Sequence, residues 1–342
     1  MKGIIVEKNG TVRLANDIPE PKVGPYDALV KTISCGICNG TDLKIIDGHF
    51  KGFDTYPCVL GHEPCGVVVE VGDKVKNYKK GDYVLRSMLA DPGPKYYSGW
   101  GSFAEYGTVS DYYAMVGDGQ KDVFTGHMAQ QKVPEDIDPQ RALMIITFKE
   151  VMSGLKRFGV APGMDIMING CGPVGLTMVR ICKIFGVKKI VVSDPHSHRR
   201  ELAASMGADV LVDPAEDDVM AKVKAECKDG LDLFIDAVGR NELMNLGLKL
   251  IKFNGKVGVY GIAAKLSAEI DWEQAPYNWD IHFVQWPTFE EEAAVHNQVV
   301  ELVRCGALDL NDFVTHLLPL EDFQKGIDLV KNKTGLKIAL TF

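Results

Sequence analysis

The sequence lacks any long apolar run. No run within its 342 residues approaches the roughly 20 consecutive apolar residues that span a bilayer. Residues 1–6 also lack the apolar core and cleavage site of a signal peptide. We therefore expect no membrane segment and a cytoplasmic protein.

The sequence also has no excess of basic residues. The formal net charge is −8, whereas a protein that binds nucleic acid or an anionic membrane presents a basic face. A hydrophobic fraction of 46% and a charged fraction of 25% are ordinary for a globular protein, and 342 residues suffice for two domains with separate cores. We expect neither nucleic acid nor a membrane as a partner.

The eight cysteines do not form the pattern of a disulfide framework. Cys35 and Cys38 make a Cys-x-x-Cys pair, but no second pair occurs that would complete a zinc knuckle. In a cytoplasmic chain we expect thiols or metal ligands. One member of the pair is expected to be functional and the other to be a small buried residue.

A histidine and a carboxylate stand side by side at His62 and Glu63, and a valine-rich segment follows them. Cys38 lies 24 residues before His62. Thiolate, imidazole and carboxylate are side chains that bind zinc, and three protein ligands with an open fourth position are typical of a catalytic site. The sequence therefore predicts zinc ligands at Cys38, His62 and Glu63.

Short alternating runs at 27–33, 67–71 and 83–85 are separated by turn residues. This pattern predicts an antiparallel β domain, in the form of a partly closed barrel. Residues 91–133 form an irregular, aromatic-rich segment that could line a substrate pocket or merely cover the edge of a core.

A second texture begins after Pro134. An apolar strand at 164–169 leads into a glycine loop, a helical stretch follows at 176–185, and a second strand at 189–193 ends at Asp194. Strand, glycine loop, helix and strand form the βαβ unit that binds dinucleotides, with the pyrophosphate at the helix N-terminus. The residues expected to hold the cofactor in this loop are Gly170, Gly172, Pro173, Val174 and Gly175.

Asp194 is expected to accept hydrogen bonds from ribose hydroxyls and to repel a 2′-phosphate, which favours NAD over NADP. Arg199 could partly offset that repulsion.

Apolar strands and helices alternate as far as residue 261, which predicts a parallel sheet of the α/β class. Helices at 293–305 and 320–331 and a strand at 337–342 are expected to rejoin the first domain.

Segment 61–72 reads Gly-His-Glu-x-x-Gly-x-Val-x-x-Val-Gly and resembles the zinc signature of the zinc-dependent alcohol dehydrogenases, in the medium-chain dehydrogenase/reductase superfamily. Segments 35–38, 103–106, 170–175 and 318–320 follow in the order of that family, and the branch most similar is that of the sorbitol, threonine and cyclitol dehydrogenases. The resemblance implies a GroES-like β-barrel catalytic domain at 1–145 and 287–342 and a doubly wound Rossmann domain at 146–286. It also implies a homodimer or homotetramer.

By the same resemblance, Cys38 and His62 would be zinc ligands, Glu63 a nearby or alternating ligand, and Thr41 the hydroxyl that relays the substrate proton. Asp42 would fix the tautomer of His62. The chain departs from the family by placing two residues, instead of one, between Cys38 and Thr41.

Two further departures concern the metal. The four-cysteine lobe of a structural zinc is absent from residues 86–130, so we predict one zinc per subunit. By the family's usual spacing, the position of a further zinc ligand falls on Ile146, and an isoleucine side chain cannot coordinate a metal. Glu150 lies one helical turn later and could replace it, although it could equally be a solvated helix residue.

The resemblance implies a zinc-dependent, NAD(P)-linked oxidoreductase that acts on a small secondary alcohol, namely a polyol, cyclitol, sugar or amino alcohol. Two alternatives stay open. One is a metal-free reductase on the same fold, which Ile146 favours and the zinc-type residues disfavour. The other is a non-catalytic protein that binds a dinucleotide.

Overall fold

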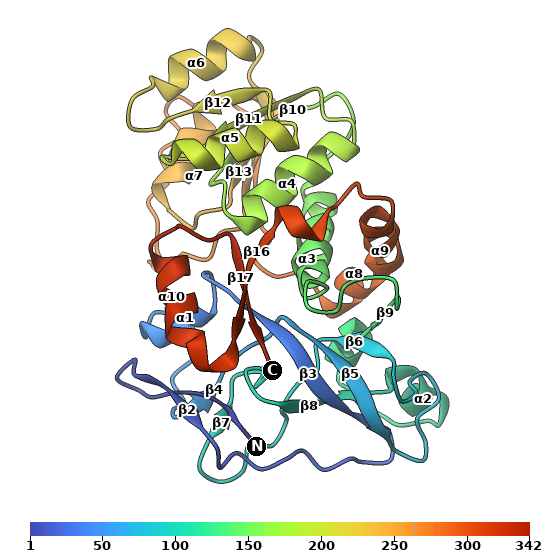
Figure 1. The fold of residues 1–342 in the computed structure, drawn as a ribbon. Helices are drawn as coiled ribbons and strands as arrows, with labels where there is room; N and C mark the ends of the chain where they lie inside the picture. The colour runs from blue at the N-terminus through green and yellow to red at the C-terminus, as the bar shows by residue number, and fades with distance from the viewer. Residues whose placement is uncertain (264) are drawn as a thin grey trace. The chain divides into compact units, whose positions relative to one another are not determined.

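The computed structural model describes residues 1–263 and 265–342, which form two compact units. The first unit contains residues Met1–Lys149 and Thr288–Phe342, and the second contains Glu150–Pro287 (Figure 1). The division falls within helix α3 (Met144–Phe158). Of the helices among the described residues, none has the length and apolar character needed to cross a membrane.

The first unit is built on two sheets. The smaller has the order β2-β1-β4-β7 and the larger has the order β16-β17-β3-β5-β6-β9, with β8 also paired to β3. The strands are β1 (Gly3–Val6), β2 (Val12–Ala15), β3 (Asp27–Ile37), β4 (Cys58–Val59), β5 (Pro64–Val71), β6 (Tyr83–Leu85), β7 (Tyr97–Ser98), β8 (Tyr106–Ser110), β9 (Lys132–Val133), β16 (Val314–Pro319) and β17 (Lys337–Thr341).

These sheets are mixed, which differs from the antiparallel prediction. β4 pairs with β7, and β16 with β17, in parallel, while the remaining neighbours are antiparallel. β17 runs antiparallel to the long strand β3, so the last strand of the chain lies beside one of the first. This pairing brings residues from opposite ends of the sequence to the metal-binding region described below.

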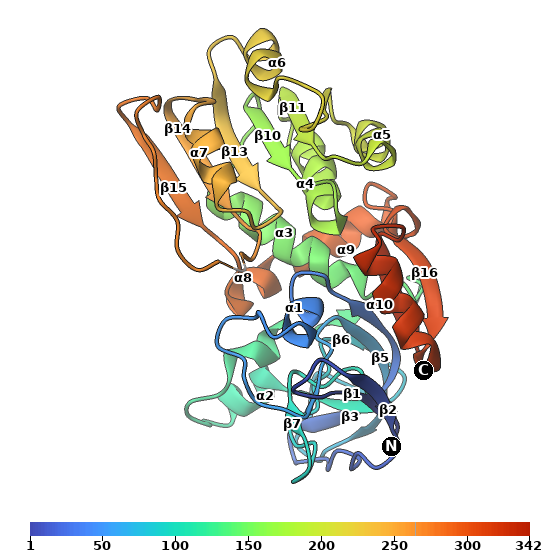
Figure 2. The same cartoon turned by 90° about the vertical axis from the view of Figure 1, so that its left-hand side faces the viewer.

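The first unit also contains short helices. They are α1 (Asp42–Ile46), α2 (Tyr112–Gly117), α8 (Phe289–Ala294), α9 (His296–Arg304) and α10 (Phe323–Lys331), with 3-10 turns at Thr125–Ala129, Leu310–Asp312 and Leu320–Asp322. The continuous helix predicted at 293–305 is two helices that meet at Val295. A capping box between Thr288 and Glu291 begins α8, a start that the apolar periodicity alone did not indicate. α10 packs against β17 and β16, and Figure 2 shows it beside β16.

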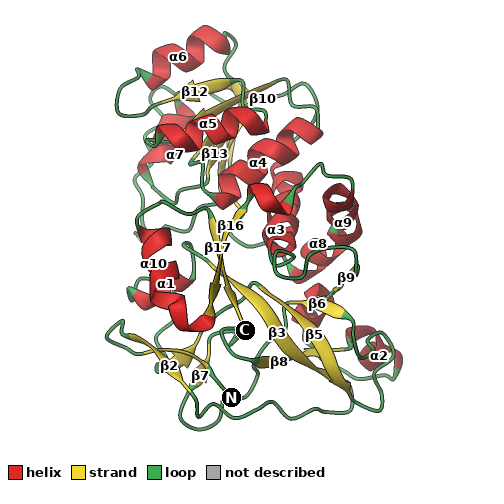
Figure 3. Ribbon diagram, in the orientation of Figure 1, coloured by secondary structure: helices red, strands yellow, loops and turns green. Residues whose placement is uncertain are grey.

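The second unit is a six-stranded sheet with the order β12-β11-β10-β13-β14-β15, in which every neighbouring pair is parallel. Helices connect most of its strands (Figure 3). The strands are β10 (Asp165–Asn169), β11 (Lys189–Ser193), β12 (Val210–Val212), β13 (Leu231–Asp236), β14 (Ile251–Val259) and β15 (Trp279–Phe283), and the helices after α3 are α4 (Pro173–Ile184), α5 (Ser197–Met206), α6 (Val219–Glu226) and α7 (Glu242–Leu248). The predicted parallel sheet is thus confirmed. Asn169 at the end of β10 pairs with Ser193 at the end of β11, so the glycine loop and Asp194 leave the sheet side by side.

Candidate metal centre and dinucleotide loop

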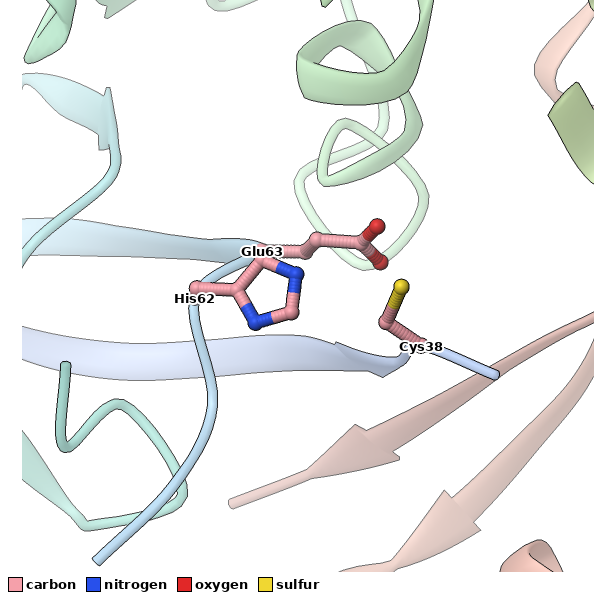
Figure 4. Close-up of side chains that lie close together, drawn as sticks. All are labelled: Cys38, His62 and Glu63. Atoms are coloured by element: carbon pink, nitrogen blue, oxygen red, sulfur yellow. The ribbon is translucent and has the colours of Figure 1, made fainter. Parts of the chain in front are cut away.

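Three predicted zinc ligands come together in the first unit. Cys38 follows β3, while His62 and Glu63 lie in the link between β4 and β5. One ligand atom of each, namely the thiol sulfur, a ring nitrogen and a carboxylate oxygen, lies within 4.8 Å of the other two (Figure 4). Thiolate, imidazole and carboxylate form a donor set that suits zinc and leaves a fourth position open. The residues present therefore fit a catalytic zinc.

Cys35, the other member of the Cys-x-x-Cys pair, does not join this group. Its side chain is fully buried in β3, and burial raises the pKa of its thiol well above the usual range. Cys35 thus behaves as a small core residue, and Cys38 is the member of the pair that lies with His62 and Glu63.

Asp42 supports two of the three ligands. It is fully buried at the start of α1, and its Oδ2 accepts a hydrogen bond of 2.9 Å from the backbone N–H of Cys38. Its Oδ1 lies 3.4 Å from Nδ1 of His62. The additional residue before Thr41 therefore does not prevent Asp42 from reaching His62. Thr41 itself is buried at the N-cap of α1.

The charge of His62 reflects these neighbours. Burial on its own would lower the pKa of His62, but the carboxylate of Asp42, followed by Cys38, raises it well above its ordinary value. Because a metal binds neutral imidazole, metal binding here would release that proton.

Glu63 is held by Lys337, a residue distant in the sequence. Nζ of Lys337 in β17 donates to Oε2 of Glu63 at 2.5 Å, and Oγ1 of Thr147 lies 3.4 Å from Oε1. Burial would raise the pKa of the Glu63 carboxyl, but Lys337, then His62 and Arg86, lower it below the usual range. Glu63 therefore stays ionised and available as an anionic ligand. No sequence motif linked Lys337 to this site.

A buried ion cluster, formed by Arg86, Lys149 and Glu292, adjoins the metal-binding residues. Nε of Arg86 donates to Oε1 of Glu292 at 2.8 Å, and Nζ of Lys149 lies 3.1 Å from the same oxygen. Burial would raise the pKa of Glu292, but the two cations lower it. Nη1 of Arg86 also donates a hydrogen bond of 3.2 Å to the backbone carbonyl of His62. The cluster thereby anchors the backbone of a predicted metal ligand.

The indole of Trp100 packs against the imidazole of His62. Their ring centroids are 5.3 Å apart, with an angle of 54° between the planes. Trp100 has a φ of +68°, a left-handed conformation that is unusual for a bulky residue and tends to occur at functional sites. The indole of Trp100 therefore lies beside the candidate metal site, and the surrounding structure must hold its backbone in this strained conformation.

The question of a further ligand concerns α3. Ile146 is fully buried and apolar, so it provides no donor. Glu150 is half-buried and begins the second unit, and ligation by this residue stays a prediction.

The glycine loop of the second unit combines a tight turn with an open backbone surface. Gly170 has a φ of +94°, which permits the tight turn after β10. A Cβ at Gly175 would overlap the carbonyl oxygen of Gly170, whereas a Cβ at Gly172 would meet no atom within 4 Å. Gly172 is the N-cap of α4 and Pro173 is at its first turn, followed by half-buried Val174. The loop therefore offers an open backbone surface and a helix N-terminus to an anion.

Asp194 lies directly beside this loop. Its Oδ2 accepts a hydrogen bond of 2.8 Å from the backbone N–H of Cys171. Arg199 follows in the first turn of α5 and is half-buried. The acid predicted to bind ribose is thus fixed to the loop predicted to bind the phosphates.

Comparison with known proteins identifies the family of the chain. Residues 24–117 match the family model of the alcohol dehydrogenase GroES-like domain, and residues 173–284 match that of the zinc-binding dehydrogenase. L-threonine 3-dehydrogenase of Photorhabdus laumondii is 28% identical, with 95% of each chain covered. Sorbitol dehydrogenase of Bombyx mori is 28% identical, with 94% of this chain and 93% of that protein covered.

Among solved structures, alcohol dehydrogenase TADH from Thermus sp. ATN1 is similar over 100% of both chains, with a TM-score of 0.82 and 25% identity. The match to the GroES-like domain lies within the first unit, and the match to the zinc-binding dehydrogenase lies within the second. The chain therefore belongs to the zinc-dependent alcohol dehydrogenase family and is an oxidoreductase.

Proposed function

We propose that the protein transfers a hydride between a small polar secondary alcohol and NAD, with one zinc held by Cys38, His62 and Glu63. The observation that carries this proposal is the convergence of these three donors within 4.8 Å. The relatives named threonine and sorbitol dehydrogenase support a substrate with several polar groups, of the polyol, cyclitol, sugar or amino-alcohol class.

Zinc, when bound, supplies Lewis acidity toward the alcohol oxygen. The chain's own residues prepare this site: Asp42 holds His62 and the backbone of Cys38, and Lys337 keeps Glu63 ionised. Thr41 is our candidate for the group that receives the hydroxyl proton of the substrate. Trp100 limits the space beside His62. Glu150 or water would be the further ligand that completes the set.

The glycine loop is the proposed pyrophosphate site, and Asp194 is the proposed partner of the adenosine ribose. Gly170, Gly172 and Gly175 supply the turn, the open backbone and the close packing that the nucleotide requires. A carboxylate next to this loop favours NAD over NADP, because it repels a 2′-phosphate.

The two compact units correspond in this proposal to a catalytic domain and a nucleotide-binding domain, divided near the predicted boundaries at residues 146 and 287.

We also propose a homodimer or homotetramer. β15 is the edge strand of the second unit's sheet and Phe283 on it is 60% exposed, a feature that favours pairing with another strand. Light scattering of the purified protein tests this assembly. A cytoplasmic location stays a prediction from the sequence.

The function is tested by measuring NADH formation with a panel of secondary alcohols, using wild type, Cys38→Ser and Cys305→Ser. Cys305 is exposed and serves as the matched control. At least one polar secondary alcohol should support turnover. Cys38→Ser should lower it by at least roughly 100-fold, because a lost oriented ligand removes transition-state stabilisation of several kcal/mol, while Cys305→Ser should be unchanged.

Two results would contradict the proposal. Turnover that survives unchanged in Cys38→Ser would favour a metal-free reductase, the reading that buried Ile146 supports. Binding of NADH without turnover of any alcohol, aldehyde or ketone would favour a non-catalytic dinucleotide-binding protein.

A further inference from the structure

The carboxylate of Asp194 is partly occupied by the chain itself. Oδ2 accepts from Cys171, as described above, and Oδ1 accepts a hydrogen bond of 2.9 Å from the backbone N–H of His196. Nδ1 of the His196 ring also lies 2.9 Å from Oδ1. Because an ionised carboxylate only accepts hydrogen bonds, this ring nitrogen carries the proton and donates it. Three of the carboxylate's roughly four acceptor positions are therefore used within the chain.

The position of His196 matters because Asp194 stands at the nucleotide end of the sheet. The backbone N–H of Gly170 donates to the carbonyl of Ser193 at 2.7 Å, so the glycine loop and Asp194 are fixed to each other. The His196 side chain is 41% exposed. A ribose that approaches Asp194 therefore also meets the imidazole of His196.

Two neighbouring basic residues, Arg200 and His198, are arranged differently from His196. Arg200 pairs with the carboxylate of Asp213 at 2.9 Å and donates to the backbone carbonyl of Asp194 at 2.6 Å, so its charge is largely offset by Asp213. The ring of His198 lies 5.8 Å from the ring of His196, centroid to centroid. The His196 side chain thus contacts the Asp194 carboxylate directly, whereas Arg200 contacts the backbone carbonyl of Asp194.

From these contacts we infer that His196 is a specificity-determining residue for the nucleotide. By donating to Oδ1 of Asp194 it removes an acceptor from the ribose hydroxyls and offsets part of the charge that repels a 2′-phosphate. The chain therefore discriminates against NADP(H) less strongly than an unpaired aspartate would. This inference rests on the proposed nicotinamide-linked function.

The test is a fluorescence titration of the full-length protein with NADH and with NADPH, in the absence of substrate. His196→Ala removes the ring donor but keeps the backbone N–H of residue 196, so one of the two occupied acceptor positions of Oδ1 becomes available to ribose. The ratio of the NADPH to the NADH dissociation constant should then rise about fivefold, which corresponds to about 1 kcal/mol. His198→Ala is the matched control and should leave the ratio unchanged. In an Asp194→Asn background, His196→Ala should have no further effect on the ratio.

A ratio within twofold of wild type in His196→Ala, or a shift toward NADPH, would overturn the inference. The same fivefold rise in the Asp194→Asn background would also overturn it, because His196 would then act without Asp194. If wild type binds neither nucleotide, the proposed function fails and this inference fails with it. If His196→Ala binds both nucleotides with the same ratio of dissociation constants as wild type, only the inference about His196 is refuted and the proposed function stands.

Discussion

Arg86, whose own φ is +56°, donates a hydrogen bond of 3.2 Å to the backbone carbonyl of His62. The guanidinium is also paired with Glu292, and its side chain is 7% exposed. A non-glycine residue in the left-handed region costs conformational energy, so the surrounding contacts must hold it there. The backbone that carries a metal ligand is thus positioned by a buried charge.

We first predict the effect of Arg86→Met. This change removes the donor to His62 and leaves Glu292 with Lys149 alone, so the free energy of unfolding should fall by about 3 kcal/mol. Zinc affinity, measured by chelator competition, should fall by roughly tenfold or more, since groups that orient metal ligands contribute at this level. Arg304→Met, which removes an exposed pair with Asp136, is the control and should change neither quantity. Unchanged zinc affinity in Arg86→Met would refute the positioning role.

The glycine loop yields a second prediction, which separates folding from binding. Gly172→Ala places its methyl group in open space, so the fold should remain, but the methyl group would lie where the loop admits a pyrophosphate. NADH affinity should fall by at least roughly tenfold, as expected when about 1.4 kcal/mol is lost. Gly175→Ala should instead unfold the second unit, because its methyl group overlaps the carbonyl of Gly170. Circular dichroism and NADH titration distinguish the two, and equal NADH affinity in wild type and Gly172→Ala would contradict the assignment of the loop.

The third prediction concerns pH and His296. Burial, followed by the charge of Lys149, lowers the pKa of His296 from 6.5 to about 4, although its ring contacts the carbonyl of Lys132 at 2.8 Å. Between these pH values the unfolded chain binds the proton and the folded chain does not. The stabilisation is therefore complete above pH 6.5, is lost as the pH falls toward 4, and amounts to on the order of 3 kcal/mol.

Urea denaturation of wild type and His296→Gln at pH 7, 5.5 and 4 measures this effect. Glutamine can still donate to the carbonyl of Lys132 but does not titrate, so its loss of stability over this range should be smaller than that of wild type. Identical pH dependence in the two proteins would show that His296 is not kept neutral by the fold.

A fourth prediction uses the backbone of Trp100. Alanine and glycine both remove the indole, but only glycine tolerates a φ of +68° without strain. Trp100→Gly should therefore be more stable than Trp100→Ala by about 1 kcal/mol in thermal or urea unfolding. If the indole lines the substrate site, both variants should show the same change in KM across the alcohol panel. A change in stability without any change in KM would make Trp100 a purely structural residue.

Local sequence features sufficed for much of this architecture. The strand, glycine loop and strand around Gly170, Gly172 and Gly175 were predictable because each residue type answers a backbone requirement within a short segment. The grouping of Cys38, His62 and Glu63 followed from their ligand chemistry and from family resemblance. The parallel pairing of β16 with β17 was not predictable, because periodicity does not reveal the direction of a neighbouring strand.

The supporting charges of the site were not predictable in this way. Lys337 and Glu63 are 274 residues apart, and Arg86 and Glu292 are 206 apart. Lysine, arginine and glutamate are usually solvated, so their types give no signal of burial. His196 was overlooked for a related reason, since a histidine near the end of a strand is commonplace until its ring is seen against Asp194.

The most direct test of the proposed catalytic metal is the zinc content per subunit, measured by elemental analysis of wild type, His62→Ala and Glu150→Ala together with alcohol-dependent NADH formation. We predict one zinc in wild type and the loss of both zinc and activity in His62→Ala, while Glu150→Ala shows whether Glu150 or water completes the site. Wild type that contains no zinc, and gains no activity when zinc is supplied, would contradict the central claim that Cys38, His62 and Glu63 hold a catalytic metal.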